Sequence, residues 1–289
     1  MRRENETTVA EEEPPLLDFA HVESITPSAT DRFSDLGTRL WTAIFLLVLG
    51  ALAIWAGGVV FVTLISVCVG LMLWELATMV QTGPKRARLM AVVGGGALFA
   101  ANVLPVGYGL PILMLVPMTA IAFVRSHRRV MTGFSVAIVL AGLSLTEHLT
   151  RFGLVWMLWL ILVVIASDVM GYFAGRTLGG PKFWPRVSPK KTWSGTIAGW
   201  VGAALIGVIW VIWQDAPGQT VGISIAIAMM AQMGDIAESA VKRRVGVKDS
   251  SNLLPGHGGL FDRFDAMLGA ALMLFVIRSL TEFPPAPVP

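Results

Sequence analysis

The sequence predicts an all-α polytopic membrane protein with about nine transmembrane helices. The composition, the length of the apolar stretches and the placement of the basic residues all point to this fold class. Hydrophobic residues make up 55% of the 289 residues and charged residues 14%, whereas about 25% of the residues in an ordinary soluble domain are charged. A soluble fold of this size needs more charge to cover its surface. The composition therefore excludes a soluble globular enzyme, a disordered chain and a coiled coil.

Nine apolar stretches have the length of a transmembrane helix, about 17–25 residues. They cover residues 39–56, 58–80, 89–106, 108–124, 131–147, 152–174, 194–213, 219–242 and 259–280. The connectors near residues 57 and 106–109 are short, so eight or ten helices would also fit. Four connectors hold fifteen of the twenty-two Lys and Arg residues, and the four that alternate with them hold only Arg151. Because basic loops stay in the cytoplasm, we expect the amino terminus there and the carboxyl terminus across the membrane.

The chain is expected to divide into four parts. Residues 1–37 are acidic and contain prolines, which predicts a disordered cytoplasmic tail. Residues 38–150 are expected to form N-terminal transmembrane helices, and residues 151–282 a transmembrane region that carries the motifs described below. Residues 283–289 are rich in proline and are expected to be frayed.

Several acidic residues lie within or at the ends of the predicted spans, where a carboxylate is expensive. At the centre of a bilayer it costs about 2.5–3.5 kcal/mol on insertion scales. These acids are Glu75, Glu147, Asp168, Asp235, Glu238, Asp262 and Asp265. Intramembrane acids at this cost indicate a functional site.

Asp235 is the most informative of these acids. Gln232, Asp235, Ser239 and Lys242 are spaced by three or four residues and so share one helix face. A polar face on a transmembrane helix predicts that the helix lines a polar active-site cavity on the cytoplasmic side. The alternative is a structural ion pair between Glu238 and Lys242, one turn apart.

A second acidic group opens the last predicted span. Asp262 and Asp265 follow His257-Gly258-Gly259 and share a helix face. Glycines let the backbone approach a ligand closely and leave amides free for anions, and oxygen ligands from two helices suit Mg²⁺. Capping of the helix amino terminus is the alternative for one of the two acids.

The third group begins with Asp168, Tyr172 and Arg176, which are spaced by four residues. A basic connector follows and ends in Ser188-Pro189-Lys190-Lys191-Thr192-Trp193. Adjacent lysines beside hydroxyls could bind phosphate oxygens. They could equally be a topology signal that only keeps the loop in the cytoplasm.

The run Ser239-Ala240-Val241-Lys242-Arg243, Lys248-Asp249, Pro255-Gly256-His257-Gly258-Gly259 and Asp262-Arg263-Phe264-Asp265 resembles the signature of the phosphatidate cytidylyltransferases, also called CDP-diacylglycerol synthases. The resemblance covers residues 165–280 firmly, and the first five helices only by hydropathy. The chain departs from the family pattern at two positions: Ser194 stands where many members carry Glu, and Gly171 where many carry Ala.

The resemblance implies that CTP and phosphatidate are joined into CDP-diacylglycerol and pyrophosphate, for phospholipid biosynthesis. It implies a Mg²⁺ centre held by Asp235 and Asp262, with a second, monovalent cation as an open alternative. Lys242 and Arg263 join these two acids as the expected catalytic residues. The expected substrate-binding residues are Asp168, Tyr172, Ser188, Lys190, Lys191, Thr192, Ser239, Arg243, Lys248, Asp249, His257, Gly258, Gly259 and Asp265.

The resemblance also places the protein in the inner (plasma) membrane, as a multi-pass protein with its active site on the cytoplasmic side. The expected partners are the two substrates and the lipid bilayer, with no nucleic acid, and a homodimer is left open. Two alternative functions remain at this point. One is an ion-coupled transporter, which would place its acids near mid-helix and would show internal repeats. The other is a different CTP-dependent lipid enzyme.

Overall fold

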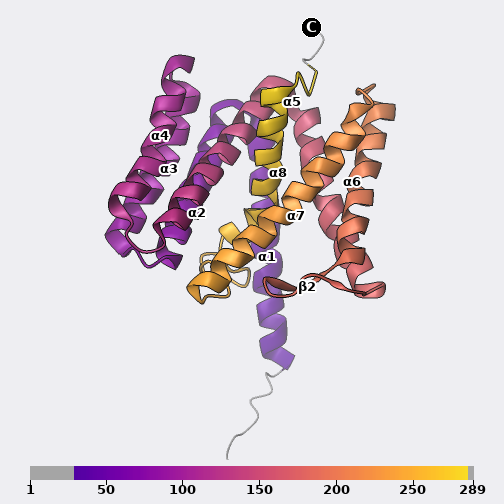
Figure 1. The fold of residues 1–289 in the computed structure, drawn as a ribbon, viewed down its shortest axis with the longest axis horizontal. Helices are drawn as coiled ribbons and strands as arrows, with labels where there is room; N and C mark the ends of the chain where they lie inside the picture. The colour runs from indigo at the N-terminus through magenta and orange to yellow at the C-terminus, as the bar shows by residue number, and fades with distance from the viewer. Residues whose placement is uncertain (1–28, 286–289) are drawn as a thin grey trace, which may run out of the picture.

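The computed structural model describes residues 29–285, which form eight α-helices and a two-stranded antiparallel sheet (Figure 1). The helices are α1 (Ala29–Ala56), α2 (Gly58–Met79), α3 (Pro84–Val103), α4 (Val106–Phe123), α5 (Arg128–Thr177), α6 (Trp193–Trp213), α7 (Gln219–Val245) and α8 (Phe261–Leu280). The strands β1 (Lys182–Trp184) and β2 (Ser188–Thr192) pair between α5 and α6. The tail predicted for residues 1–37 lies outside the described residues as far as residue 28, and α1 begins at Ala29.

Within residues 29–285, five helices are long and apolar enough to cross a membrane: α1 from Arg39 onward, α2, α5, α6 and α7. Their large apolar side chains are widely exposed. On α1, for example, Trp41, Phe45 and Trp55 are 73%, 64% and 79% exposed. A lipid-facing surface accounts for apolar exposure on this scale, which a soluble monomer rarely shows. The fold is therefore that of an all-α membrane protein, and the count of nine spans stays a prediction.

Helix α5 covers two of the predicted spans, 131–147 and 152–174. It is 50 residues long and is interrupted at Gly153, whose φ of 78° and ψ of −173° are not helical. A positive φ costs glycine little, because glycine has no Cβ. The boundary between the two predicted spans is therefore a break inside one helix, at the residue best able to form it.

Glycines at the crossing of α7 and α8 let the two backbones approach closely. A Cβ added to Gly269 would lie 2.0 Å from the carbonyl oxygen of Met230, and one added to Gly234 would lie 2.3 Å from that of Asp265. Small residues allow this kind of close packing in membrane proteins. The crossing brings the middle of α7 against the first turns of α8, where the acids of the predicted motifs lie.

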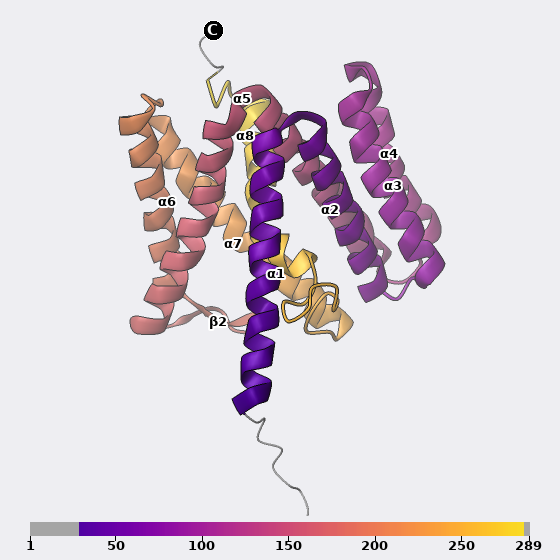
Figure 2. The same ribbon diagram turned by 180° about the vertical axis from the view of Figure 1, so that it is seen from behind.

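The hairpin and the α7–α8 loop lie at the same end of the bundle, and the described carboxyl-terminal end lies at the other (Figures 1 and 2). The buried core lies among α2, α3, α5, α7 and α8; its largest fully buried side chains include Leu73, Met90, Trp159, Ile227 and Phe261. Phe283 is also buried and packs edge-on against Trp156 and Trp159. Phe283 is thus packed where the sequence predicts a frayed end, and residues 286–289 lie outside the described residues.

Candidate active site

The polar face predicted on α7 is present in the structure. Ser239 Oγ donates to Asp235 Oδ1 at 3.4 Å, which shows that these two side chains lie on the same face. One turn further on, Lys242 Nζ lies 2.6 Å from Glu238 Oε2. The ion pair that was the structural alternative for Glu238 therefore exists, and Glu238 is also almost fully buried.

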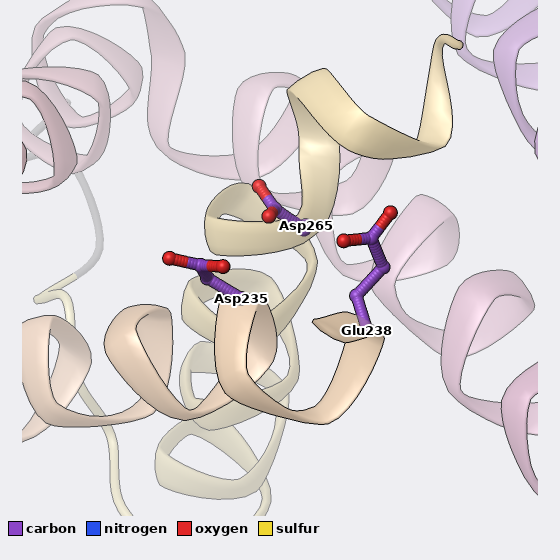
Figure 3. A group of neighbouring side chains, drawn as sticks. All are labelled: Asp235, Glu238 and Asp265. Carbon is purple, nitrogen blue, oxygen red and sulfur yellow. The ribbon is translucent and has the colours of Figure 1, made fainter. Parts of the chain in front are cut away.

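Three carboxylates from the two crossing helices converge at this face. Oxygens of Asp235 and Glu238 on α7 and of Asp265 on α8 all lie within 4.8 Å of one another (Figure 3). The close approach at Gly234 and Gly269 places Asp265 beside α7. Carboxylate oxygens grouped in this way are the hard ligands that Mg²⁺ prefers. The residues present therefore fit a divalent cation.

Asp262 is a neighbour of this trio but has other partners. Its Oδ1 lies 2.7 Å from Lys242 Nζ, so Lys242 bridges Glu238 and Asp262. Its Oδ2 accepts hydrogen bonds from the amides of Ser250 and Gly259, both at 2.9 Å, and from the Ser250 hydroxyl at 3.0 Å. Of the predicted metal pair, Asp235 thus belongs to the converging group, and Asp262 holds Lys242 and the α7–α8 loop.

Gly258 and Gly259, which precede α8, allow the α7–α8 loop to adopt its conformation. Gly258 has a φ of 81°, and a Cβ added to Gly259 would lie 1.9 Å from Ser250 Oγ. The sequence predicted that their amides would be free for an anion. The amide of Gly259 is instead donated to Asp262. Arg263 Nε donates to the carbonyl of His257 at 3.0 Å, so that the loop closes on itself.

The hairpin supplies a second lysine to the site. Lys191 Nζ lies 2.6 Å from Asp235 Oδ2 and donates to the Gln232 carbonyl at 3.3 Å. Thr192, the next residue, is the N-cap of α6 and accepts from the Gly195 amide at 3.2 Å. Lys190 is exposed. The two adjacent lysines thus have different surroundings, and only Lys191 contacts the trio.

The remaining predicted site residues surround the trio, and Asp168 interacts electrostatically with Lys191, Asp235 and Asp265. Asp168 and Tyr172 are exposed on α5, where Tyr172 Oη accepts from Arg176 Nη1 at 2.8 Å. Ser188 is half-buried in the hairpin. The exposed members on α7 and the following loop are Arg243, Lys248 and Asp249. They add charge around the site without touching the trio.

Sequence reasoning did not assign a role to Glu75, which the structure brings to this region. Glu75 lies on α2 and is fully buried. Its carboxylate accepts hydrogen bonds from the amides of Leu260 and Phe261 at 2.9 and 2.7 Å. The sequence showed only that Glu75 is an acid within an apolar span. The residues that donate to it follow it by 185 and 186 residues, and no local pattern points to them.

A cavity of about 580 Å³ lies at the other end of α8. Its charged lining residues are Glu147, Arg151, Arg278 and Glu282, and none of the predicted site residues lines it. Arg278 Nη2 lies 2.8 Å from Glu147 Oε2. The polar active-site cavity on the cytoplasmic side therefore stays a prediction.

Comparison with known proteins identifies similar chains. The model of the cytidylyltransferase family matches residues 37–281. A phosphatidate cytidylyltransferase of Brucella suis is 37% identical over 268 residues, which cover 88% of this chain and 97% of the relative. Proteins of the same name from Helicobacter pylori and Bacillus subtilis are 44% identical over 133 residues and 36% identical over 137 residues. These two matches cover 45% and 46% of this chain, and 50% and 51% of the relatives.

Proposed function

The chain belongs to the cytidylyltransferase family, and we propose that it transfers the cytidylyl group of CTP to phosphatidate, giving CDP-diacylglycerol and pyrophosphate for phospholipid biosynthesis. The observation that carries this proposal is the group of three carboxylates, Asp235, Glu238 and Asp265, flanked by Lys191 and Lys242. Acids for a divalent cation beside lysines for phosphates are what a nucleotidyl transfer needs. The names of the relatives supply the substrates.

The reaction is a displacement at phosphorus. An anionic phosphate oxygen of phosphatidate attacks the α-phosphorus of CTP, and a new P–O bond forms. The bond from that phosphorus to the oxygen bridging the α- and β-phosphates breaks, and pyrophosphate leaves with the electron pair. Because the nucleophile is already anionic, no strong general base is required. The main obstacle is repulsion among the phosphates, which cations and correct positioning overcome.

We propose that Asp235 holds Mg²⁺, since it is the acid shared by the resemblance and by the converging group. The resemblance implies Asp262 as the second ligand, and the geometry adds Asp265 and Glu238 as candidates. The bound cation supplies positive charge to the phosphates of CTP. A second, monovalent cation could bind the acid that does not coordinate Mg²⁺.

The basic residues of this end have separate proposed roles. Lys191 and Lys242 hold the acids in place and lie nearest to the reacting phosphates. Lys190, Arg243, Lys248 and Arg263 are exposed at the same end and attract the phosphates of CTP and phosphatidate. The basic loops support a cytoplasmic location for this end, which is where CTP is available. We place the protein in the inner membrane on the same grounds, with its exposed apolar side chains in the bilayer.

An ion-coupled transporter is not favoured. Transport sites built from intramembrane acids lie near the middle of the bilayer. Here Asp262 and Asp265 lie in the first two turns of α8, beside a loop with Lys248 and Arg263. A charged group at a helix end beside basic loops suits phosphate chemistry better than passage of an ion.

The proposal is tested with the purified full-length protein in detergent or vesicles. Radiolabelled CTP, phosphatidate and Mg²⁺ are supplied, and label is measured in the chloroform-soluble lipid. Incorporation that requires both phosphatidate and Mg²⁺ is expected. A folded protein that makes no labelled lipid at any Mg²⁺ concentration would overturn the proposal, and label transferred to a different lipid acceptor would favour the other CTP-dependent lipid enzymes.

A further inference from the structure

Glu75 is a buried carboxylate that accepts hydrogen bonds from neutral donors. Its side chain on α2 is inaccessible to solvent. Oε1 accepts from Ser251 Oγ at 2.6 Å and from the Leu260 amide at 2.9 Å. Oε2 accepts from the Phe261 amide at 2.7 Å and from Ser250 Oγ at 3.4 Å. A carboxylate buried in this way is costly unless its oxygens are fully hydrogen-bonded, and here both oxygens are.

The two amide donors, those of Leu260 and Phe261, lie at the start of α8. The first amides of a helix have no acceptor within the helix, and a side chain just before the helix usually caps them. Leu260, at that position, has no side chain that can do so. The carboxylate of α2 takes this role across the bundle, and its negative charge is favoured at the positive end of the helix dipole.

The same contacts fix the position of Asp262. Phe261 precedes Asp262 directly, and the single hydroxyl proton of Ser250 is shared between Asp262 Oδ2 at 3.0 Å and Glu75 Oε2 at 3.4 Å. Asp262 in turn holds Lys242, which holds Glu238 of the trio. A chain of hydrogen bonds and ion pairs therefore runs from α2 through the loop and α8 to the carboxylates on α7.

We infer that Glu75 is a positioning residue of the active site: it holds the start of α8 and the α7–α8 loop so that Asp262 and Lys242 face the trio. The inference rests on the proposed function for its effect on turnover. Glu75 does not touch the trio, so it acts only through the residues it holds. Helix α2 thus takes part in the site through Glu75.

The isosteric substitution Glu75→Gln tests this inference. Both carboxylate oxygens accept backbone amides, so the NH₂ group of Gln must face one of these N–H donors. The start of α8 then shifts. Misplacement of about 1 Å in an active site can cost about 100-fold in rate, and loss of an outer-shell partner of a site typically costs about 10- to 100-fold. We expect kcat to fall by about 10- to 100-fold, with KM for CTP changed by less than about threefold, because the exposed basic residues are intact.

Glu147→Gln is the matched control. Glu147 also ties another helix to α8, through Arg278, but it does so about 24 Å further along the helix. It should leave kcat unchanged. Hydrogen–deuterium exchange of residues 246–262, measured on both variants and the wild type, supplies a readout that does not depend on activity. Exchange should rise in Glu75→Gln and remain as in the wild type in Glu147→Gln.

The outcomes separate the two proposals. If the wild type makes no CDP-diacylglycerol, the proposed function fails, and loop exchange still decides whether Glu75 holds the loop. If Glu75→Gln has wild-type kcat per folded molecule, or wild-type loop exchange, the positioning role is refuted. Should this variant not fold, Ser251→Ala removes one donor and leaves the carboxylate in place. A partial loss of kcat with faster loop exchange would then support the role, and wild-type behaviour in both would refute it.

Discussion

Lys191 of the hairpin and Asp235 of α7 form an ion pair, with Lys191 Nζ 2.6 Å from Asp235 Oδ2. Both side chains are partly buried, with 25% and 35% of their surface exposed. The pair ties the hairpin before α6 to the helix that carries two of the three converging acids. The adjacent Lys190 is exposed and serves as a natural comparison.

Lys191→Ala should therefore lower kcat far more than Lys190→Ala. Loss of Lys191 removes the ion-pair partner of Asp235 and a positive charge next to the reacting phosphates. Removal of one such electrostatic group typically costs about 100-fold or more in kcat. Lys190→Ala should raise KM a few-fold at most, since an exposed charge is screened by solvent. Steady-state kinetics on both variants measure this difference; equal effects would show that the hairpin only carries a topology signal.

Asp235→Asn should abolish turnover while the protein still inserts and folds. The amide is isosteric but lacks the charge that a divalent cation requires. Binding of Mn²⁺, followed by electron paramagnetic resonance in the absence of substrate, should weaken together with the loss of activity. A variant that kept its kcat at ordinary Mg²⁺ would show that Asp235 is not a ligand.

Asp262→Asn and Asp265→Asn compare two of the three candidates for the second ligand, the one implied by the resemblance and the one on α8 in the converging group. Both should lose turnover. If Asp262 is the second ligand, as the resemblance implies, Asp262→Asn loses Mn²⁺ binding. If the converging group is the site, Asp265→Asn loses Mn²⁺ binding, and Asp262→Asn loses only catalysis because Lys242 is released. Wild-type Mn²⁺ affinity in both variants would contradict both assignments.

The hairpin and the described carboxyl-terminal end should lie on opposite sides of the membrane. The basic connectors predict this, and the two segments lie at opposite ends of the bundle (Figures 1 and 2). Single cysteines replace Lys190 or Glu282 in a background in which Cys68 is changed to Ser. In intact spheroplasts, a membrane-impermeant maleimide should label only the cysteine at position 282. Labelling of both positions would refute the nine-span topology.

Gly269→Ala should destabilise the crossing of α7 and α8. The added methyl group would meet the Met230 carbonyl, a backbone atom that cannot move aside alone. Overpacking of this kind typically costs about 1–3 kcal/mol, and here it also separates Asp235 from Asp265. The control is Gly222→Ala on α7, where the added Cβ meets nothing within 4 Å. Thermal unfolding in detergent should show a lower Tm for Gly269→Ala only; equal Tm values would mean that the helices adjust freely.

Helix positions and the polar face of α7 could be predicted from the sequence. The spans predicted at 194–213 and 219–242 correspond to α6 and α7 within a few residues, because hydropathy and spacing are local properties. The grouping of Asp235 with Asp265 instead depends on how closely two helices cross, which Gly234 and Gly269 determine in three dimensions. The partners of Glu75 are more remote still, since five helices, α3 to α7, lie between them in the sequence.

Helix α8 is held at both ends by acids that precede residue 150. Glu75 binds its first amides, and Glu147 pairs with Arg278 near its last turn. Contacts at both ends of α8 therefore cross the boundary expected at residue 150, so the chain cannot be divided there and joined to another protein without losing them. In a chimaera, residues 29–150 of this chain would be joined to the motif-bearing region of a distant family member. That region would have to contain hydrogen-bonding partners for both Glu75 and Glu147. Exchange of parts among members of the family is thus limited by two contacts that the signature itself does not contain.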